Sequence, residues 1–299
     1  MTLILACLTP DTVVLAADRR LTDLASGRLI DDDAAKVVVV AGQIVLAYTG
    51  LAHVKPPPRG RTDLWLVDRI EPDARDLLEI FTHIRDEASE RFRLITHLGP
   101  RKKRHAFIGA GWELRAEGWS PFVGVVSNAL EPNGMWRRWP STEFNIGHFT
   151  LAANTRFATY SAGQDARAEC ASLERMLAHE QELAPSRIAA LLTSTIRRVA
   201  ERNTAVGRGV MTVVIPRQTV GAEGMVLRGP QLPEPSETEF PPSDGPTAYY
   251  LAPDSNMGTI FAPHHVTKQM KLADVQIHNR ALSAEEIRQR YEQGIRERE

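Results

Sequence analysis

The chain has 299 residues, of which 43% are apolar and 24% are charged, and its formal net charge is −1. This composition excludes a collagen-like or disordered chain and is typical of a globular protein with one large core or two modest ones. A net charge so close to zero gives no reason to expect a polyanionic partner. The two cysteines, Cys7 and Cys170, offer neither a disulfide framework nor metal-ligand spacing, and we expect both to be small core residues.

Four short apolar segments near the N-terminus predict β-strands over residues 2–8, 12–17, 36–40 and 43–49. Each segment is almost continuously apolar, which is typical of strands that are covered on both faces. Ala41 and Gly42 predict a hairpin turn between the last two strands. The three prolines at 56–58 then interrupt regular structure.

Helical spacing of apolar residues predicts helices over about residues 72–95, over 164–183, and from Pro185 onward. Shorter apolar runs predict further strands at 106–110, 122–126, 149–153, 157–160 and 209–215. By itself, this order of elements indicates only a mixed α and β protein.

Composition changes after residue 216. Residues 217–247 are rich in proline and glycine and predict a linker or a surface arm. Residues 248–299 predict a small strand and helix extension, with Ser283 as the helix cap and a narrow apolar stripe at Ile287, Tyr291 and Ile295. The segment 274–287 is also similar to the closing segment of laminin-G-like lectin sandwiches, but a packing or assembly arm is the preferred interpretation. We therefore divide the chain into 1–216, 217–247 and 248–299.

Thr2 is the first candidate for chemistry. Removal of Met1 would give Thr2 both a hydroxyl nucleophile and a free α-amine, whose ordinary pKa of about 8 suits a base near neutral pH. Asp18 closes the second predicted strand, Lys36 opens the third, and Gly50 closes the fourth. Each of these residues also has a plain structural interpretation, as a strand-end acid, a surface lysine or a turn glycine.

Taken in this order, Thr2, Asp18, Lys36 and Gly50 resemble the proteasome β-subunits and the HslV and Anbu peptidases, which are N-terminal-nucleophile (Ntn) hydrolases. The resemblance is strongest over residues 2–50, where about two residues are inserted near Ala25–Gly27. It extends more weakly to residues 158–163, which match a turn of small residues, and to residues 206–215, which match the last core strand.

The resemblance implies an α+β fold built as a four-layer αββα sandwich. It implies a threonine-type amide or peptide hydrolase in which Thr2 attacks, Lys36 tunes the amine, Asp18 holds Lys36 and the Gly50 N–H binds the oxyanion. The family's serine beside the amine maps best to Ser161, although a shift of one residue would put Ala162 there. It also implies a homo-oligomer that acts on peptides or unfolded proteins. It implies no cofactor and no metal, and whether an ATPase partner acts with it stays open. The chain departs from the family pattern at Asn203 and Val206, where an acid and a serine are expected.

Two other functions stay open: a catalytically silent subunit that serves as an assembly scaffold, and an amidase of small molecules. The basic run Arg101–Arg104 contains no aromatic residue, so we expect a solvated loop and no nucleic-acid contact. The sequence shows no membrane-spanning segment or signal peptide, which predicts a cytoplasmic protein without a membrane contact.

Overall fold

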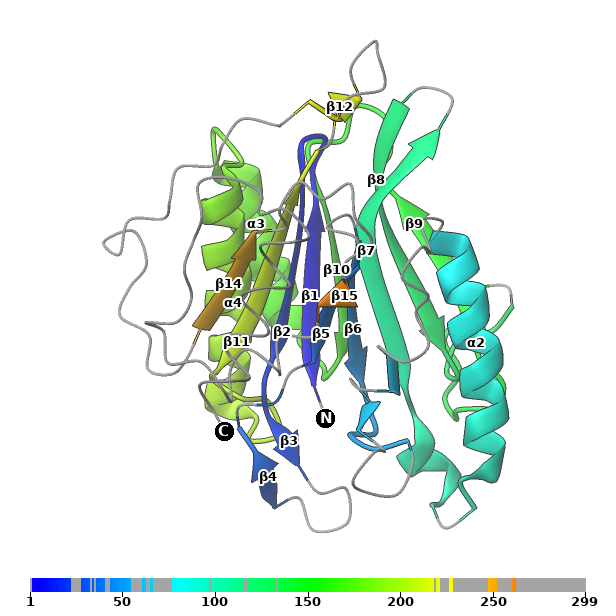
Figure 1. Ribbon diagram of the computed structural model, residues 1–299. Coiled ribbons are helices and arrows are strands. Elements are labelled where there is room, and N and C mark those ends of the chain that lie inside the picture. The colour runs from blue at the N-terminus through cyan, green and yellow to red at the C-terminus, as the bar shows by residue number, and fades with distance from the viewer. Residues whose placement is uncertain are drawn as a thin grey trace, which may run out of the picture. The chain divides into compact units, whose positions relative to one another are not determined.

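A computed structural model describes residues 2–22, 28–32, 34, 36–40, 44–54, 61–62, 65–66, 77–96, 98–115, 118–132, 134–217, 219–220, 226–227, 247–251 and 260–261. The chain forms two compact units, residues 1–263 and 264–299. All of the second unit lies outside the described residues, so the description that follows concerns the first (Figure 1).

The N-terminal strands form the centre of a five-stranded sheet with the order β10-β1-β2-β11-β14. Its neighbouring strands are antiparallel, except that β14 runs parallel to β11. Every residue of β1 and β2 is buried, in agreement with the prediction of strands covered on both faces. The bounds are β1 Leu3–Leu8, β2 Thr12–Asp18, β10 Ala158–Gly163, β11 Val210–Pro216 and β14 Thr247–Leu251.

A second sheet of six antiparallel strands has the order β15-β5-β6-β7-β8-β9. Two short hairpins, β3-β4 and β12-β13, stand apart from both sheets. The bounds are β5 Val37–Val40, β6 Ile44–Thr49, β7 Ala106–Arg115, β8 Gly118–Ser127, β9 Asn145–Thr150 and β15 Ile260–Phe261 in the sheet, and β3 Leu21–Thr22, β4 Leu29–Asp31, β12 Thr219–Val220 and β13 Val226–Leu227 in the hairpins.

Three apolar clusters hold these elements together, because successive side chains of a strand point to opposite faces. Helices α3 (Arg167–His179) and α4 (Pro185–Arg202) pack on one face of the first sheet through Leu3 and Leu5 among others. Ile4 and Ala6, on the other face, pack against the second sheet. Helix α2 (Leu77–Leu94) covers the far face of that second sheet. In Figure 1 the helices accordingly stand on the two outer sides of the paired sheets.

The predicted elements and the observed ones differ mainly at their ends. Strand β9 spans Asn145–Thr150, whereas the sequence predicted a strand at 149–153. The strand begins earlier than predicted because its pairing with β8 starts at Asn145, opposite Ser127, and polar residues of this kind give no apolar signal. Helix α3 is shorter than the predicted 164–183. The expected insertion at 25–27, the C-terminal strand expected at 272–278 and the helix expected from Ser283 all lie outside the described residues.

Candidate active site

A buried ion pair joins two of the residues singled out by the sequence. The Lys36 Nζ donates to Asp18 Oδ1 at 3.1 Å, and both side chains are fully buried. Lys36 also donates to the carbonyl oxygen of Arg20. Desolvation by burial lowers the pKa of the Lys36 ammonium, and the Asp18 carboxylate opposes that shift.

The same carboxylate holds the backbone beside Thr2. The N–H of Leu3 donates to Asp18 Oδ2 at 2.7 Å, and the N–H of Gly207 donates to Oδ1 at 3.1 Å. Asp18 therefore links the first residues of β1, the Lys36 ammonium and the turn before β11. Because Asp18 is buried, loss of these partners would leave an unpaired carboxylate away from water, which would destabilise the fold.

Two further bonds fix the carbonyl oxygen of Thr2. Thr49 Oγ1 donates to it at 3.2 Å, and the N–H of Gln164 donates to it at 3.0 Å. Gly163, with φ of +100°, allows this approach, because a β-carbon there would lie 1.8 Å from the Thr2 oxygen. Thr2 itself is only 3% exposed.

Gly50 follows Thr49 at the end of β6 and adopts φ of +118°, a conformation that favours glycine. A β-carbon on Gly50 would lie 2.4 Å from the carbonyl oxygen of Arg104 and 2.7 Å from His105 Nδ1. The next N–H, that of Leu51, donates to His105 Nδ1 at 3.0 Å. The Gly50 turn therefore packs against Arg104 and His105, the two residues that precede β7.

His105 is buried under α2, where its ring lies against Phe92, Phe107 and Phe144. Because Nδ1 accepts a hydrogen bond, the ring proton resides on Nε2, which has no hydrogen-bond partner among the described residues. Burial lowers the pKa of His105 to about 3, so the ring is neutral at physiological pH.

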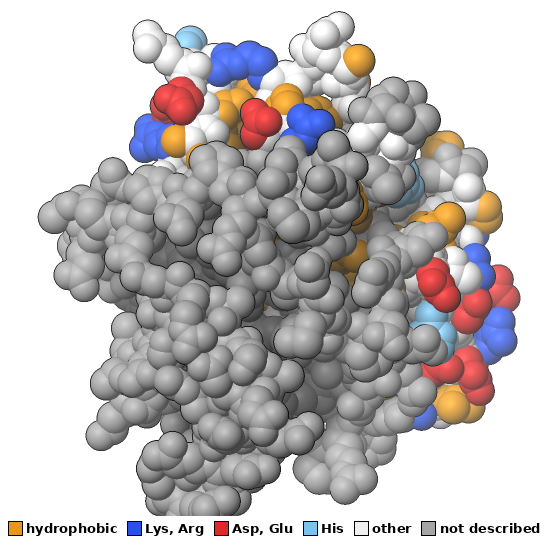
Figure 2. All heavy atoms as spheres, turned by 45° about the horizontal axis from the view of Figure 1, so that its top comes forward, with side chains coloured by type: hydrophobic (Ala, Val, Ile, Leu, Met, Phe, Trp, Pro, Cys, Tyr) orange, Lys and Arg blue, Asp and Glu red, His pale blue; other side chains and the backbone are white. Residues whose placement is uncertain are grey.

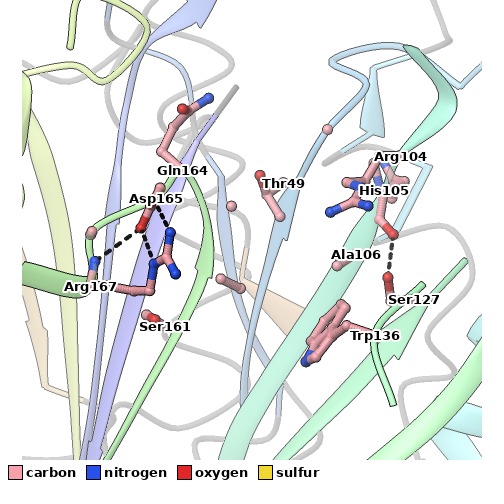
Figure 3. Close-up of a pocket in the computed structure, with 14 residues that line it drawn as sticks. Thr49, Arg104, His105, Ala106, Ser127, Trp136, Ser161, Gln164, Asp165 and Arg167 are labelled. Carbon is pink, nitrogen blue, oxygen red and sulfur yellow. Dashed lines mark hydrogen bonds and ion pairs between the residues drawn. The ribbon is translucent and has the colours of Figure 1, made fainter. Parts of the chain in front are cut away.

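A cleft of about 250 Å³ opens beside Thr49 and Gly50. In Figure 3 it lies between two walls, with Thr49 between them. One wall carries Ser161, Gln164, Asp165 and Arg167, and the other carries Arg104, His105, Ser127 and Trp136. Asp165 and Arg167 pair with each other at 2.9 Å, and this pairing lowers the pKa of the Asp165 carboxyl to about 2.

The structure does not bring Ser161 opposite Thr2. In the β1–β10 ladder Ser161 pairs with Leu5, and Gly163 pairs with Leu3. Asn203 Nδ2 donates to Gln164 Oε1 at 3.0 Å, and Gln164 in turn donates its backbone N–H to the Thr2 carbonyl oxygen. Val206 is a buried core residue between the first sheet and its helices.

Sequence reasoning missed several contributors to the site, among them Thr49, Gly163, Gln164 and His105. Gly163 had a usable signal, since it follows two small residues at a strand end. Gln164 and His105 had none, because they act through tertiary contacts with residues more than 50 positions away in the chain. Cys7 is no alternative nucleophile, because burial raises the pKa of its thiol to about 12.

The described part of the chain contains no cluster of three or more His, Cys, Asp or Glu side chains suited to a metal ion. Among its helices, none is long and apolar enough to cross a membrane.

Two structures of Anbu proteins are similar to this chain. The first, Anbu (ancestral beta-subunit) from Yersinia bercovieri, has 13% sequence identity and a TM-score of 0.47, with 72% of this chain and 81% of that chain covered. The second, an Anbu (Gly-1) mutant from Hyphomicrobium sp. strain MC1, has 15% identity and a TM-score of 0.47, with 80% and 90% covered. No protein-family model and no curated protein matches the sequence.

Proposed function

We propose that this protein is a threonine-type amide or peptide hydrolase that uses Thr2 after removal of Met1. The observation that carries the proposal is the single buried carboxylate of Asp18, which binds both the Lys36 ammonium and the N–H of Leu3, the residue after Thr2. A buried lysine and aspartate held beside a chain terminus form an arrangement suited to lowering the pKa of a terminal amine.

The reaction begins when the Thr2 hydroxyl oxygen attacks the carbonyl carbon of an amide. The hydroxyl proton passes, through a water, to the α-amine of Thr2. The Gly50 N–H donates to the oxyanion, a type of contact whose loss costs about 3–4 kcal/mol of transition-state stabilisation. The C–N bond then breaks, and the leaving amine takes the proton. This leaves an ester on Thr2, which water hydrolyses with the same α-amine as the base.

The layered packing supports the four-layer αββα sandwich that we propose for the first unit. The apolar clusters follow one another from α3 and α4, through the two sheets, to α2. The bond from the Leu3 N–H to Asp18 and the bond from Thr49 Oγ1 to the Thr2 carbonyl oxygen support a site at the start of β1 and the ends of β2 and β6. Ser161 has no direct part in this proposal, because its register places it opposite Leu5.

A catalytically silent scaffold subunit is the second candidate. The observation that favours it is that Asn203 and the buried Val206 supply neither a carboxylate nor a hydroxyl in the turn before β11. Such a subunit would keep the Asp18–Lys36 pair for stability alone.

Intact mass and turnover distinguish the two candidates. We expect the purified protein to lack the mass of Met1 and to hydrolyse unstructured peptides, with small amides included in the substrate panel. Thr2→Ala should abolish hydrolysis and leave the unfolding midpoint unchanged, whereas Thr2→Ser should keep partial activity because the hydroxyl and amine remain. Retention of Met1, or full activity of Thr2→Ala, would remove the mechanism. Hydrolysis of small amides alone would assign the amidase function.

A further inference from the structure

A basic face borders the cleft. The 3₁₀ helix η1 (Pro100–Lys103) and Arg104 carry four consecutive cations, and the turn before residue 140 adds Arg137 and Arg138. Among the described residues, Arg137 has an ion pair with Glu131 at 3.7 Å. The described side chains visible in Figure 2 mix both signs of charge.

Trp139 organises the arginines of this face, although no aromatic residue lies within the basic run in sequence. The Arg101 guanidinium stands 3.9 Å above the Trp139 ring, and that of Arg138 stands 5.3 Å from the ring centre. Stacking fixes the plane of a guanidinium and leaves its N–H edge free for a planar anion such as a carboxylate. These two arginines are therefore held in place before any ligand binds.

Arg104 connects the basic face to the cleft. Its Nη2 donates to the carbonyl oxygens of Arg137 and Arg138 at 2.8 and 2.9 Å, and within the described residues it has no ion pair with a carboxylate. Arg104 and Trp136 both line the cleft. Gly50, the proposed oxyanion donor, also lines this cleft, so the unbalanced positive charge of Arg104 and that donor face the same space.

The opposite wall does not compensate this charge. Asp165 is paired with Arg167, so that wall is close to neutral. A substrate side chain entering the cleft beside the reacting carbonyl therefore meets one unpaired cation.

We propose that the preferred substrates are polypeptides with an acidic side chain next to the cleaved amide. The carboxylate binds the Arg104 guanidinium, and further acidic residues along the peptide bind Arg101 and Arg138. This inference rests on the proposed hydrolase function. A nucleic acid also carries negative charge, but single strands bind largely by stacking bases on aromatic faces. One face of Trp139 is already occupied by Arg101, which favours the peptide.

The test uses the full-length protein and three otherwise identical peptides with Glu, Gln or Lys beside the cleaved bond. We expect kcat/KM to be about 10- to 100-fold higher for the Glu peptide than for the Gln peptide, the range for a hydrogen bond to a charged group. Arg104→Gln should bring this ratio close to one, and Arg104→Glu should shift the preference to the Lys peptide. Arg156→Gln is the matched control. Like Arg104, Arg156 donates to two backbone carbonyls, at 2.8 and 3.2 Å. In this variant the ratio of kcat/KM for the Glu peptide to that for the Gln peptide should stay unchanged.

Binding to the Thr2→Ala variant tests the inference without turnover. The Glu peptide should bind the variant more tightly than the Gln peptide, and Arg104→Gln should remove the difference. Equal kcat/KM values for the Glu and Gln peptides would overturn the inference while leaving the hydrolase intact. If no peptide is hydrolysed, the proposed function fails, and the binding measurement still decides the inference. Tighter binding of a single-stranded RNA of equal charge than of the Glu peptide would assign the face to nucleic acid and overturn the peptide proposal.

Discussion

The Asp18 carboxylate is shared by four donors from separate parts of the chain. They are the N–H groups of Leu3, Arg20 and Gly207 and the ammonium of Lys36. The three backbone donors keep the carboxylate satisfied even without the lysine, whereas the lysine depends on Asp18 for its charge. The two partners should therefore respond differently to substitution.

Lys36→Met should affect catalysis more than folding. It removes the ammonium that tunes the Thr2 amine, so we expect turnover to fall by at least about 100-fold. Stability should fall less, because three N–H donors still satisfy Asp18. Asp18→Asn should lower the free energy of unfolding by about 3–5 kcal/mol, the range for a broken buried pair. Peptide turnover and urea unfolding measure the two effects.

An exposed pair supplies the control for these substitutions. Arg85 and Asp86 form an ion pair at 2.8 Å on the surface of α2, and Arg85→Met should change neither turnover nor stability measurably. Wild-type turnover and an unchanged urea midpoint in both Lys36→Met and Asp18→Asn would show that the Asp18–Lys36 pair serves neither catalysis nor stability.

At the scale of elements, the sequence predicted the buried strands well and the site only in part. Strands β1, β2, β5 and β6 are marked by continuous apolar runs, and their ends place Thr2, Asp18, Lys36 and Gly50. The paired strands β3-β4 are too short to give a periodic signal. The contact of Gly50 with His105 depends on how β6 and β7 lie side by side, which no local pattern encodes.

The junction between β6 and β7 should make the fold sensitive to acid. In the folded chain the pKa of His105 is about 3, well below its ordinary value of 6.5, so the folded state binds fewer protons than the unfolded state between these values. Stability should therefore fall as the pH drops from about 6.5 towards 3, with a slope of up to about 1.4 kcal/mol per pH unit from this one group.

His105→Phe separates the two roles of this ring. The variant loses the acceptor for the Leu51 N–H, which should cost about 1–3 kcal/mol at neutral pH. It cannot titrate, so its stability should change less between pH 6.5 and 3, as measured by urea unfolding at each pH. Replacement of the exposed His83 on α2 by Gln is the control and should keep the wild-type slope. An identical slope in His105→Phe would show that His105 does not cause the acid sensitivity.

At the scale of the whole molecule, two short strands late in the chain, at residues 247–251 and 260–261, each add to one of the two sheets. Strand β14 pairs with β11 in the first sheet, and β15 pairs with β5 in the second. Without these strands, β11 and β5 would become open sheet edges, whose unpaired N–H and C=O groups favour association with other chains. The apolar stripe expected at Ile287, Tyr291 and Ile295 belongs to the second unit and predicts a different role, as a contact that assembles a homo-oligomer.

Two truncations should separate these roles. Deleting residues 248–299 removes β15 and most of β14, so we expect a lower unfolding midpoint together with an altered oligomer mass. Deleting only 264–299 keeps both strands and should leave the midpoint of the first unit nearly unchanged, while light scattering shows a smaller assembly. In either truncation, subunits that stay folded should keep the Thr2 reaction, because Asp18, Lys36 and Gly50 all precede residue 51.

If the shorter deletion kept the full oligomer mass, the stripe would have no part in assembly. If the longer deletion also kept the wild-type midpoint, β14 and β15 would contribute nothing to the stability of the two sheets.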